Sequence, residues 1–424
     1  MSTIPRAGRY RDAFASAEFR ALFGAFVVSM LGYVVAGLAL TVLVYRQTRS
    51  PLLSALVFTA TFLPYLFGGT LLSGLVDRVP SRRLLVGCDL GCAAIVAAMT
   101  VPGVPVPALF ALLFAMSLLT PVATGARGAL VADVLPPDAV VPARSLLRLV
   151  GQGAQVAGYA AGGGLLAALP PRAVLGVEAV TFTASALVLR VLLARRPARG
   201  GAGGSLAGDS LRGVTRVLAN GPLRRVLLLG WLVPFLTTWP EALAAPAVAG
   251  RGLPASATGW WLAADPVGTV LGELAGIWLI PAARRARLSA PLAACGFVPL
   301  AFFAVRPPLV PALVLLTAAG LCGAYVLGLD QLLLDVTPPE LLGRAYALNS
   351  AGLMVTQGVG FATAGALGEF VPPDLAITFA GGTGLVVVAL CRPPRRPAVR
   401  PVPVAPAPVH RAPDAPAAGA GDGT

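Results

Sequence analysis

The chain has 424 residues, of which 57% are hydrophobic and 12% are charged, and it carries a formal net charge of +14. This composition excludes a soluble protein of ordinary domain size, because so much apolar surface needs lipid as its solvent. It also argues against a basic nucleic-acid-binding protein, whose arginines would cluster on soluble segments beside base-stacking aromatic side chains.

Twelve long apolar runs follow one another along the chain, separated by short polar turns. Each approaches or exceeds the roughly 20 residues with which an α-helix crosses a bilayer. Continuous runs of this length favour helices over the short alternating strands of a membrane barrel. We therefore predict an all-α membrane protein with twelve transmembrane helices, at 20–45, 51–76, 84–101, 105–133, 144–168, 173–193, 223–248, 255–281, 288–305, 308–335, 344–368 and 374–391.

The basic residues are 32 arginines, and their placement predicts the orientation. With the amino terminus in the cytoplasm, 25 of them lie on the inner side, two lie within spans (Arg127 and Arg148), and five lie outside: Arg46, Arg49, Arg172, Arg251 and Arg306. This asymmetry follows the positive-inside rule, so we expect both termini in the cytoplasm. No signal peptide is evident. Exclusive use of Arg, with abundant Ala, Gly and Pro, is typical of a GC-rich bacterial genome, so the expected location is the bacterial plasma membrane.

The second part of the chain repeats the first at an offset of 202 residues. Asp133-Val134 falls on Asp335-Val336, and the match extends in both directions through Pro64 and Pro266, Arg82-Arg83 and Arg284-Arg285, Gln155 and Gln357, Gly158 and Gly360, and Gly163 and Gly365. Parallel six-helix repeats of this kind predict two pseudo-symmetric halves. The expected organisation is a cytoplasmic segment at 1–19, a first half at 20–194, a cytoplasmic linker at 195–222, a second half at 223–392 and a disordered cytoplasmic tail at 393–424.

A charged loop between the second and third runs carries the most specific motif. Its residues Gly74, Asp77, Arg78, Arg82 and Arg83 resemble the pattern Gly-x-x-x-Asp-Arg-x-Gly-Arg-Arg of the major facilitator superfamily, although Gly74 lies one residue too close to Asp77 and the inner Gly is missing. The resemblance extends over essentially all of 15–392. It implies that the loop gates alternating access. In this arrangement Asp77 would contact the start of helix 11, which begins near Arg344, and the loop arginines would pair with Asp133. The alternative is that these charges only set the topology.

A closer resemblance is to drug:proton antiporters of the macrolide-efflux type, through Phe19-Arg20-x-Leu22-Phe23, Leu43-Val44-Tyr45 and Leu63-Pro64. That branch commonly has Asp in helix 1 where this chain has Tyr33. Helix 5 resembles the antiporter signature Gly-Pro-x-x-Gly-Gly, with Tyr159 in place of Pro. The alternative for these small residues is close helix packing, at Gly158, Gly162, Gly163, Gly360 and Gly365.

Carboxyl groups inside spans are costly and should face a cavity or a partner. Asp265, beside Pro266 in helix 8, is the leading candidate for proton coupling or substrate binding, and Glu273, Glu241 and Glu178 are further candidates. The alternative for Asp265 and Glu273 is a paired structural acid, and the alternative for Glu241 is a solvated acid near the outer face. Glu178 is about five residues into helix 6, at an ambiguous depth. Helix 7 should be bent, because Pro234, Pro240 and Pro246 recur along it.

The residues favour a transporter over an enzyme. Five cysteines without metal-ligand spacing and a single His410 in the tail offer neither a metal site nor a hydrolase triad, so we expect no cofactor. The predicted function is proton-coupled export of a hydrophobic or amphipathic small molecule by a monomer in the lipid bilayer. A siderophore-like export substrate or the uptake of a nutrient is the alternative. Candidate cavity residues are aromatic: Tyr33, Phe62, Tyr65, Trp231, Phe235, Trp260, Trp261 and Tyr325.

Overall fold

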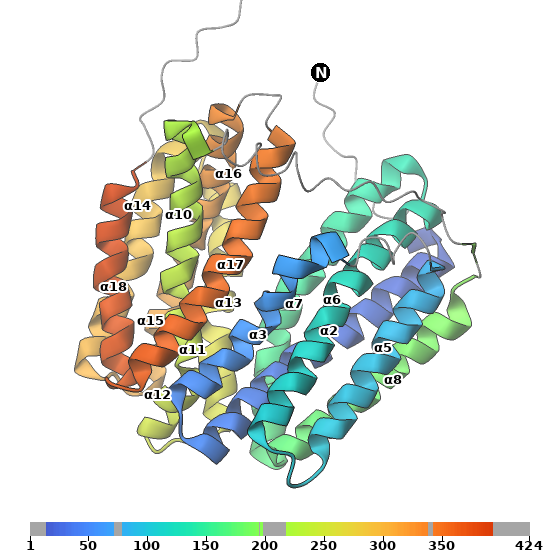
Figure 1. Cartoon of the computed structure of the whole chain (residues 1–424). Helices are drawn as coiled ribbons and strands as arrows, with labels where there is room; N and C mark the ends of the chain where they lie inside the picture. Colours follow the sequence, from blue (N-terminus) through green and yellow to red (C-terminus); the bar gives the residue numbers. More distant parts are fainter. Residues whose placement is uncertain (1–13, 72–78, 195, 198–217, 338–341, 393–424) are drawn as a thin grey trace, which may run out of the picture. The chain divides into compact units, whose positions relative to one another are not determined.

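The computed structural model describes residues 14–71, 79–194, 196–197, 218–337 and 342–392 (Figure 1). All regular elements in these ranges are helices. The loop residues 72–78, most of the predicted linker and the predicted tail lie outside the described residues.

Six helices form the first half, and the ends of five of them match the predicted spans within five residues, whereas the fifth begins at 137, seven residues before the predicted 144. Proline occupies one of the first positions in several of them, where its missing N–H costs nothing. The helices are α2 (Ala17–Thr48), α3 (Pro51–Leu71), α5 (Ser81–Thr100), α6 (Val106–Val134), α7 (Pro137–Ala168) and α8 (Pro171–Leu192).

The second half has six further spans, three of which are built from successive helical pieces. The seventh span, in which the prolines predicted a bend, is divided at Thr238 and Leu243 into α10 (Gly221–Thr237), α11 (Trp239–Ala242) and α12 (Ala244–Gly250). The others are α13 (Ser256–Leu279), α14 (Ala282–Ala301) with η1 (Phe302–Val305), α15 (Leu309–Leu321) continued by η2 (Cys322–Ala324) and α16 (Tyr325–Val336), α17 (Leu342–Gly368) and α18 (Pro373–Leu390).

The outer helical faces are apolar, as a lipid environment requires. Among the described residues, nine helical stretches are long and apolar enough to cross a membrane. Large apolar side chains point outward from them, including Trp278, which is 84% exposed, and Leu390, which is 77% exposed. The described apolar part of α3 is shorter, and α3, α7 and α17 complete the twelve spans. The predicted fold class, twelve helices in two six-helix halves, is confirmed.

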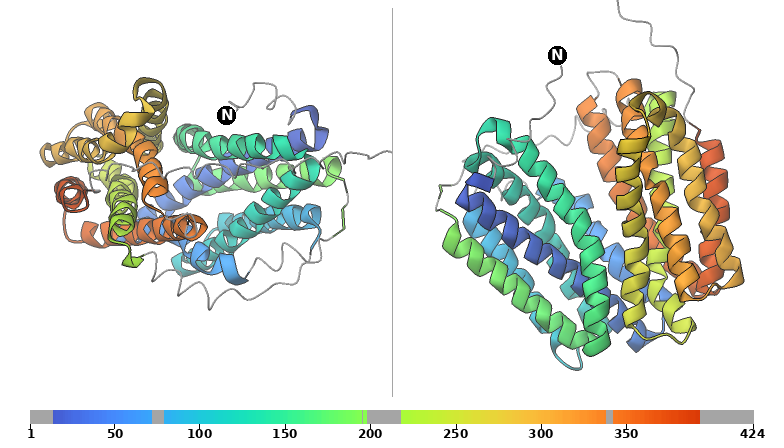
Figure 2. Two further views of the ribbon diagram at one scale, coloured as in Figure 1. Left: turned by 90° about the horizontal axis from the view of Figure 1, so that it is seen from above. Right: turned by 180° about the vertical axis from the view of Figure 1, so that it is seen from behind.

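The two halves meet along two seams that the internal repeat makes equivalent. On one seam α7 packs against α13, and a Cβ added at Gly163 would lie 2.8 Å from the Ser256 carbonyl oxygen. On the other, α17 packs against α3, and a Cβ at Gly365 would lie 2.9 Å from the Cα of Leu52. Because Gly163 and Gly365 are repeat partners, the same small residue permits the same close approach twice. Figure 2 shows the helices of the two halves from above and from behind.

The contacts between the halves described here lie toward one side of the molecule. We define the near side by the helix ends at which the described chain begins and ends, at residues 14 and 392. Residues 194 and 218, which flank the linker, lie on the same side. The turns between successive helix pairs, such as 49–50 and 369–372, define the far side. Both glycine seams lie close to these far-side turns. In the first half, a separate apolar cluster that includes Phe19, Leu85 and Leu130 fills the near side and has no member from the second half among the described residues.

Candidate functional site

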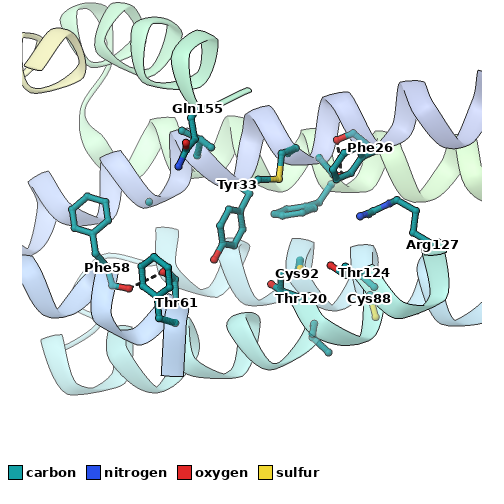
Figure 3. A pocket seen from close by; sticks show the side chains of 18 of the residues that line it. Phe26, Tyr33, Phe58, Thr61, Cys88, Cys92, Thr120, Thr124, Arg127 and Gln155 are labelled. Carbon is teal, nitrogen blue, oxygen red and sulfur yellow. Dashed lines mark hydrogen bonds between the residues drawn. The ribbon is translucent and has the colours of Figure 1, made fainter. Parts of the chain in front are cut away.

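A cavity of about 550 Å³ lies between the helices of the first half and reaches the second half at the seam (Figure 3). Side chains from α2, α3, α5, α6, α7 and α8 form most of its wall. The second half contributes Glu241 from α11 and Met354, Gln357 and Phe361 from α17. One volume therefore touches both halves, as a substrate site in a rocking transporter must.

An aromatic stack closes the cavity at the α3–α17 seam. The ring of Phe361 lies 4.9 Å from that of Phe58 and 5.6 Å from that of Phe62, nearly parallel to both. Thr59 on the same turn of α3 donates a hydrogen bond to the Gly358 carbonyl oxygen at 3.1 Å. Phe26, Tyr33 and Phe182 add further aromatic surface to the cavity wall. Such a wall suits flat or branched apolar groups.

A carboxyl group from the second half lies at the other seam. The hydroxyl of Tyr159 on α7 donates to Oε1 of Glu241 at 2.7 Å, so this hydrogen bond joins the two halves inside the cavity wall. The interruption of the helix between α10 and α12 places Glu241 at this seam, because α11 is a single helical turn between Thr238 and Leu243. Asp265 on α13 lies close enough to Glu241 for the two carboxyl groups to interact electrostatically. Asp265 itself is not among the described side chains that line the cavity.

A second polar group occupies the cavity wall within the first half. Asp89 on α5 accepts a hydrogen bond from Ser185 at 2.6 Å and is 6% exposed. The guanidinium of Arg127 lies 4.0 Å from the ring centre of Phe26, and its charge also acts on Asp89. The charges of Asp89 and Arg127 therefore partly offset each other, and both groups belong to the first half. In Figure 3 the Arg127 side chain extends into the cavity beside Phe26.

Two glutamines line the cavity from equivalent positions of the repeat. Gln155 on α7 and Gln357 on α17 both belong to its wall. Each amide can donate and accept, so the pair offers neutral polar contacts from both halves.

Glu178 is buried between α8 and α2 instead of facing the cavity. It is 1% exposed, its Oε1 has no hydrogen-bond partner, and its Oε2 accepts from Thr181 at 3.3 Å. Gly32 makes room for it, since a Cβ at that position would clash with both carboxyl oxygens. This acid therefore lies against Gly32, next to Tyr33 in the sequence of α2.

Three acids of the second half, Asp265, Asp330 and Glu273, lie within electrostatic range of the Tyr325 hydroxyl, and Tyr325 is 8% exposed. Asp330 also lies within electrostatic range of Glu273. Glu273 is half-buried on α13 and is absent from the cavity wall among the described residues.

The loop motif is described only in part. Gly74, Asp77 and Arg78 lie outside the described residues, and so does the side chain of Arg344 at the start of α17. Arg82 donates a hydrogen bond to the carbonyl oxygen of Arg190, near the end of α8. Arg83 and Asp133 are exposed.

The aromatic candidates divide between cavity and core. Tyr33 and Phe62 line the cavity, whereas the Tyr65 side chain is not described. Trp261 is 1% exposed and packs in the core. Its indole N–H donates a hydrogen bond to the Pro240 carbonyl oxygen at 2.8 Å. Trp231 donates to the Asn349 carbonyl oxygen, Phe235 packs against Trp239, and Tyr325 belongs to the apolar core; Trp260 is 53% exposed.

The glycine candidates lie at close helix contacts. A Cβ at Gly158 would lie 2.8 Å from the Cβ of Val34, and one at Gly162 would lie 2.8 Å from Leu38. One at Gly360 would clash with the Phe235 carbonyl oxygen.

Sequence reasoning missed Phe58, Phe361 and the glutamine pair as cavity residues. The repeat contained a usable signal for the glutamines, because polar side chains at equivalent positions inside spans are rarely needed for packing. No group of three or more metal-binding side chains occurs in the described part of the chain.

Comparison with known proteins agrees with this geometry. The family model described as Major Facilitator Superfamily matches residues 22–304, while no curated protein matches the chain. Similar solved structures include a variant of the nucleoside transporter NupG, at 14% identity over 88% of this chain and 98% of that one, with a TM-score of 0.68. The peptide transporter POT in complex with sulfate is 14% identical over 89% and 94% of the two chains, with a TM-score of 0.66. A bacterial homologue of the iron transporter ferroportin in an inward-facing state is 15% identical over 88% and 96%, with a TM-score of 0.62.

Proposed function

The chain belongs to the major facilitator superfamily of membrane transporters, and we propose that it exports a hydrophobic or amphipathic small molecule in exchange for protons. Export and proton coupling go beyond family membership, which supports a secondary transporter of unspecified substrate. Drugs, antibiotics and other secondary metabolites are the substrate class in question. We further propose that it acts as a monomer in the bacterial plasma membrane, with its near side in the cytoplasm.

The observation that carries the proposal is the composition of the cavity. Its wall is mainly aromatic and apolar, it is in contact with both halves, and it presents Glu241 at the seam. An amphipathic molecule can place its apolar part against the Phe58–Phe361 stack and its polar part toward Glu241 or the glutamine pair. A small, highly polar nutrient would find few hydrogen-bonding partners on this mainly aromatic wall.

Proton coupling follows from the position of the same carboxyl group. A carboxyl group that loses contact with water binds a proton more readily, and it releases the proton when water returns. Glu241 lies between the halves, so a rocking motion would change its access to water. The nearby charge of Asp265 connects the second candidate to the same site.

The loop at 74–83 is proposed as the near-side gate. Arg82 supports this role indirectly, because its hydrogen bond ties the start of α5 to the end of α8 and so fixes one end of the loop on the first half.

The test is substrate-dependent proton movement in proteoliposomes, measured with a panel of lipophilic drugs and an imposed pH gradient. Wild type should show drug-dependent proton flux, and Glu241→Gln should abolish it, with Asp265→Asn reducing it. Glu18→Gln is the matched control, because Glu18 pairs with Arg196 at 2.6 Å outside the cavity. Flux that persists in Glu241→Gln would remove that residue from coupling. An absence of flux with every drug in verified wild-type protein would favour a siderophore-like substrate or nutrient uptake.

A further inference from the structure

One hydrogen-bonded contact on the far side links the end of α17 to the start of α3. Glu369 follows the last residue of α17, and Oε1 of its carboxylate accepts a hydrogen bond from the backbone N–H of Leu52 at 3.0 Å. The same oxygen accepts a hydrogen bond from the hydroxyl of Ser50. Glu369 belongs to the second half and the other two residues to the first, so the contact crosses between the halves.

The donors of the first turn of α3 explain why a group from the other half is needed. Pro51 has no N–H, Leu53 donates to the Ser50 hydroxyl oxygen at 3.1 Å, and Ser54 donates to the Ser50 carbonyl oxygen at 3.1 Å. This leaves the N–H of Leu52, for which the described residues of the first half provide no acceptor. Glu369 therefore completes the N-terminal cap of α3, and its negative charge also suits the positive end of the helix.

The backbone geometry presents this helix end to Glu369. Arg49 ends α2 in the left-handed conformation, with φ of 56°, which turns the chain sharply between α2 and α3. A Cβ at Gly368 would lie 3.1 Å from the Cβ of Pro51, so the two helix ends are in direct contact. The position of the carboxylate is thus set by packing on both sides.

We infer that Glu369 is the far-side gating residue of this transporter, which holds the cavity closed on that side by capping α3 from the opposite half. The inference rests on the proposed alternating access. When the far side opens, the start of α3 must leave the end of α17, and water replaces the carboxylate at Leu52. The contact therefore stabilises one state of the transport cycle and not the other.

The internal repeat supports a specific role over a general packing one. The position equivalent to Glu369 in the first half is Ala167, and the position equivalent to Ser50 in the second half is Gly252. The glycine seams are duplicated, whereas this polar contact exists on one seam alone. It is thus an addition to a symmetric interface that would close without it.

The experiment measures opening of the far side directly. A cysteine at Thr61, which lines the cavity, is placed in a variant without the five natural cysteines, and a membrane-impermeant thiol reagent is presented from the far side. Loss of an N-terminal cap changes an equilibrium by roughly fivefold. Glu369→Ala should therefore raise the labelling rate roughly fivefold. Glu369→Gln, which keeps an acceptor but not the charge, should give an intermediate rate.

The matched control is Glu18→Ala, which removes a paired glutamate on the near side of the first half without touching the seam. Equal labelling of Glu369→Ala and its parent would overturn the inference, and so would an equal rise in Glu18→Ala. Melting temperature and elution profile identify a misfolded variant, in which case Glu369→Gln alone decides. The assay needs neither drug nor pH gradient. If the gating inference is wrong, the labelling rate stays unchanged. If the proposed export is wrong, the separate assay shows no drug-dependent proton flux.

Discussion

Among the described glycines that face the other half, Gly259 on α13 leaves the least room for a side chain, and it gives the sharpest test of the seam. A Cβ at this position would lie 2.5 Å from both the Cα of Gly163 and the carbonyl oxygen of Tyr159. Ordinary contacts begin at 3.4 Å, so Gly259→Ala requires the two helices to separate by 0.9 Å (3.4 − 2.5). Both neighbours are backbone atoms, and no side-chain rotation can relieve the clash.

The energetic consequence can be bounded with a matched variant. Overpacking costs about 1–3 kcal/mol, while replacing Gly by Ala inside a helix returns up to about 1 kcal/mol. Gly164→Ala is the control, because a Cβ there meets nothing within 4 Å and the change has the same helix-propensity gain. The difference between the two variants is therefore the clash alone, about 1–3 kcal/mol, or roughly 5- to 150-fold in the equilibrium between closed and open far side.

Far-side labelling of the cysteine at Thr61 measures this difference. Gly259→Ala should label faster than Gly164→Ala by at least fivefold, whereas Gly164→Ala should label at the rate of its parent. Equal rates in the two variants would refute the reasoning, because the seam would then tolerate a methyl group that the packing excludes.

Three further changes test other parts of the molecule. Phe361→Ala removes a side chain that is 1% exposed, so it should destabilise the protein by roughly 3–5 kcal/mol and lower its melting temperature; Phe370→Ala, at a position 85% exposed, should not. Asp374→Asn breaks the pair with Arg251, at 2.5 Å between side chains that are 9% and 13% exposed, and should cost about 3 kcal/mol in thermal denaturation; an unchanged melting temperature would mean that the pair contributes nothing. Glu178→Gln should leave the melting temperature unchanged or raised, because an amide is less costly to bury than a carboxylate, and a clear fall would contradict the observed lack of a partner for Oε1.

The helices and their pairing were predictable because lipid makes the sequence pattern unusually direct. Each span must satisfy its own backbone and present apolar side chains to lipid, so run length alone locates it. The interruption of the seventh span at Thr238 and Leu243 was predictable as a bend from its prolines, since proline removes a helical donor. The offset of 202 residues predicted which helices are equivalent, and the structure places the equivalent glycines at equivalent seams.

The cavity wall was less predictable, because an aromatic residue in a span can face lipid, core or cavity with the same local pattern. Trp261 and Phe361 illustrate the point, since only tertiary contacts place one ring in the core and the other in the wall. The contact of Glu369 with Leu52 was also hidden from the sequence. It joins a turn after one helix to the start of another across 317 residues, and no local motif records such a partner.

Comparison of the two halves separates packing from chemistry. The seam glycines Gly163 and Gly365 are duplicated, and so are the neutral cavity amides. Four acids within the spans are not: the positions equivalent to Asp89, Glu178, Glu241 and Asp265 are Pro291, Ala380, Ala39 and Leu63.

The repeat partner of Tyr159 is Phe361, and the single hydroxyl by which they differ decides what each side chain does at its seam. Tyr159 donates to Glu241, whereas Phe361 stacks on Phe58 and Phe62. Both seams lie on the far side of the molecule, so their equivalent contacts break together when that side opens. A response to a bound proton needs groups beyond these shared packing contacts. Among the described residues, Tyr159, Glu241 and Glu369 are ionisable side chains that have no equivalent in the other half and also bond across a seam. They are therefore the positions at which we expect substitution to change coupling without changing the fold.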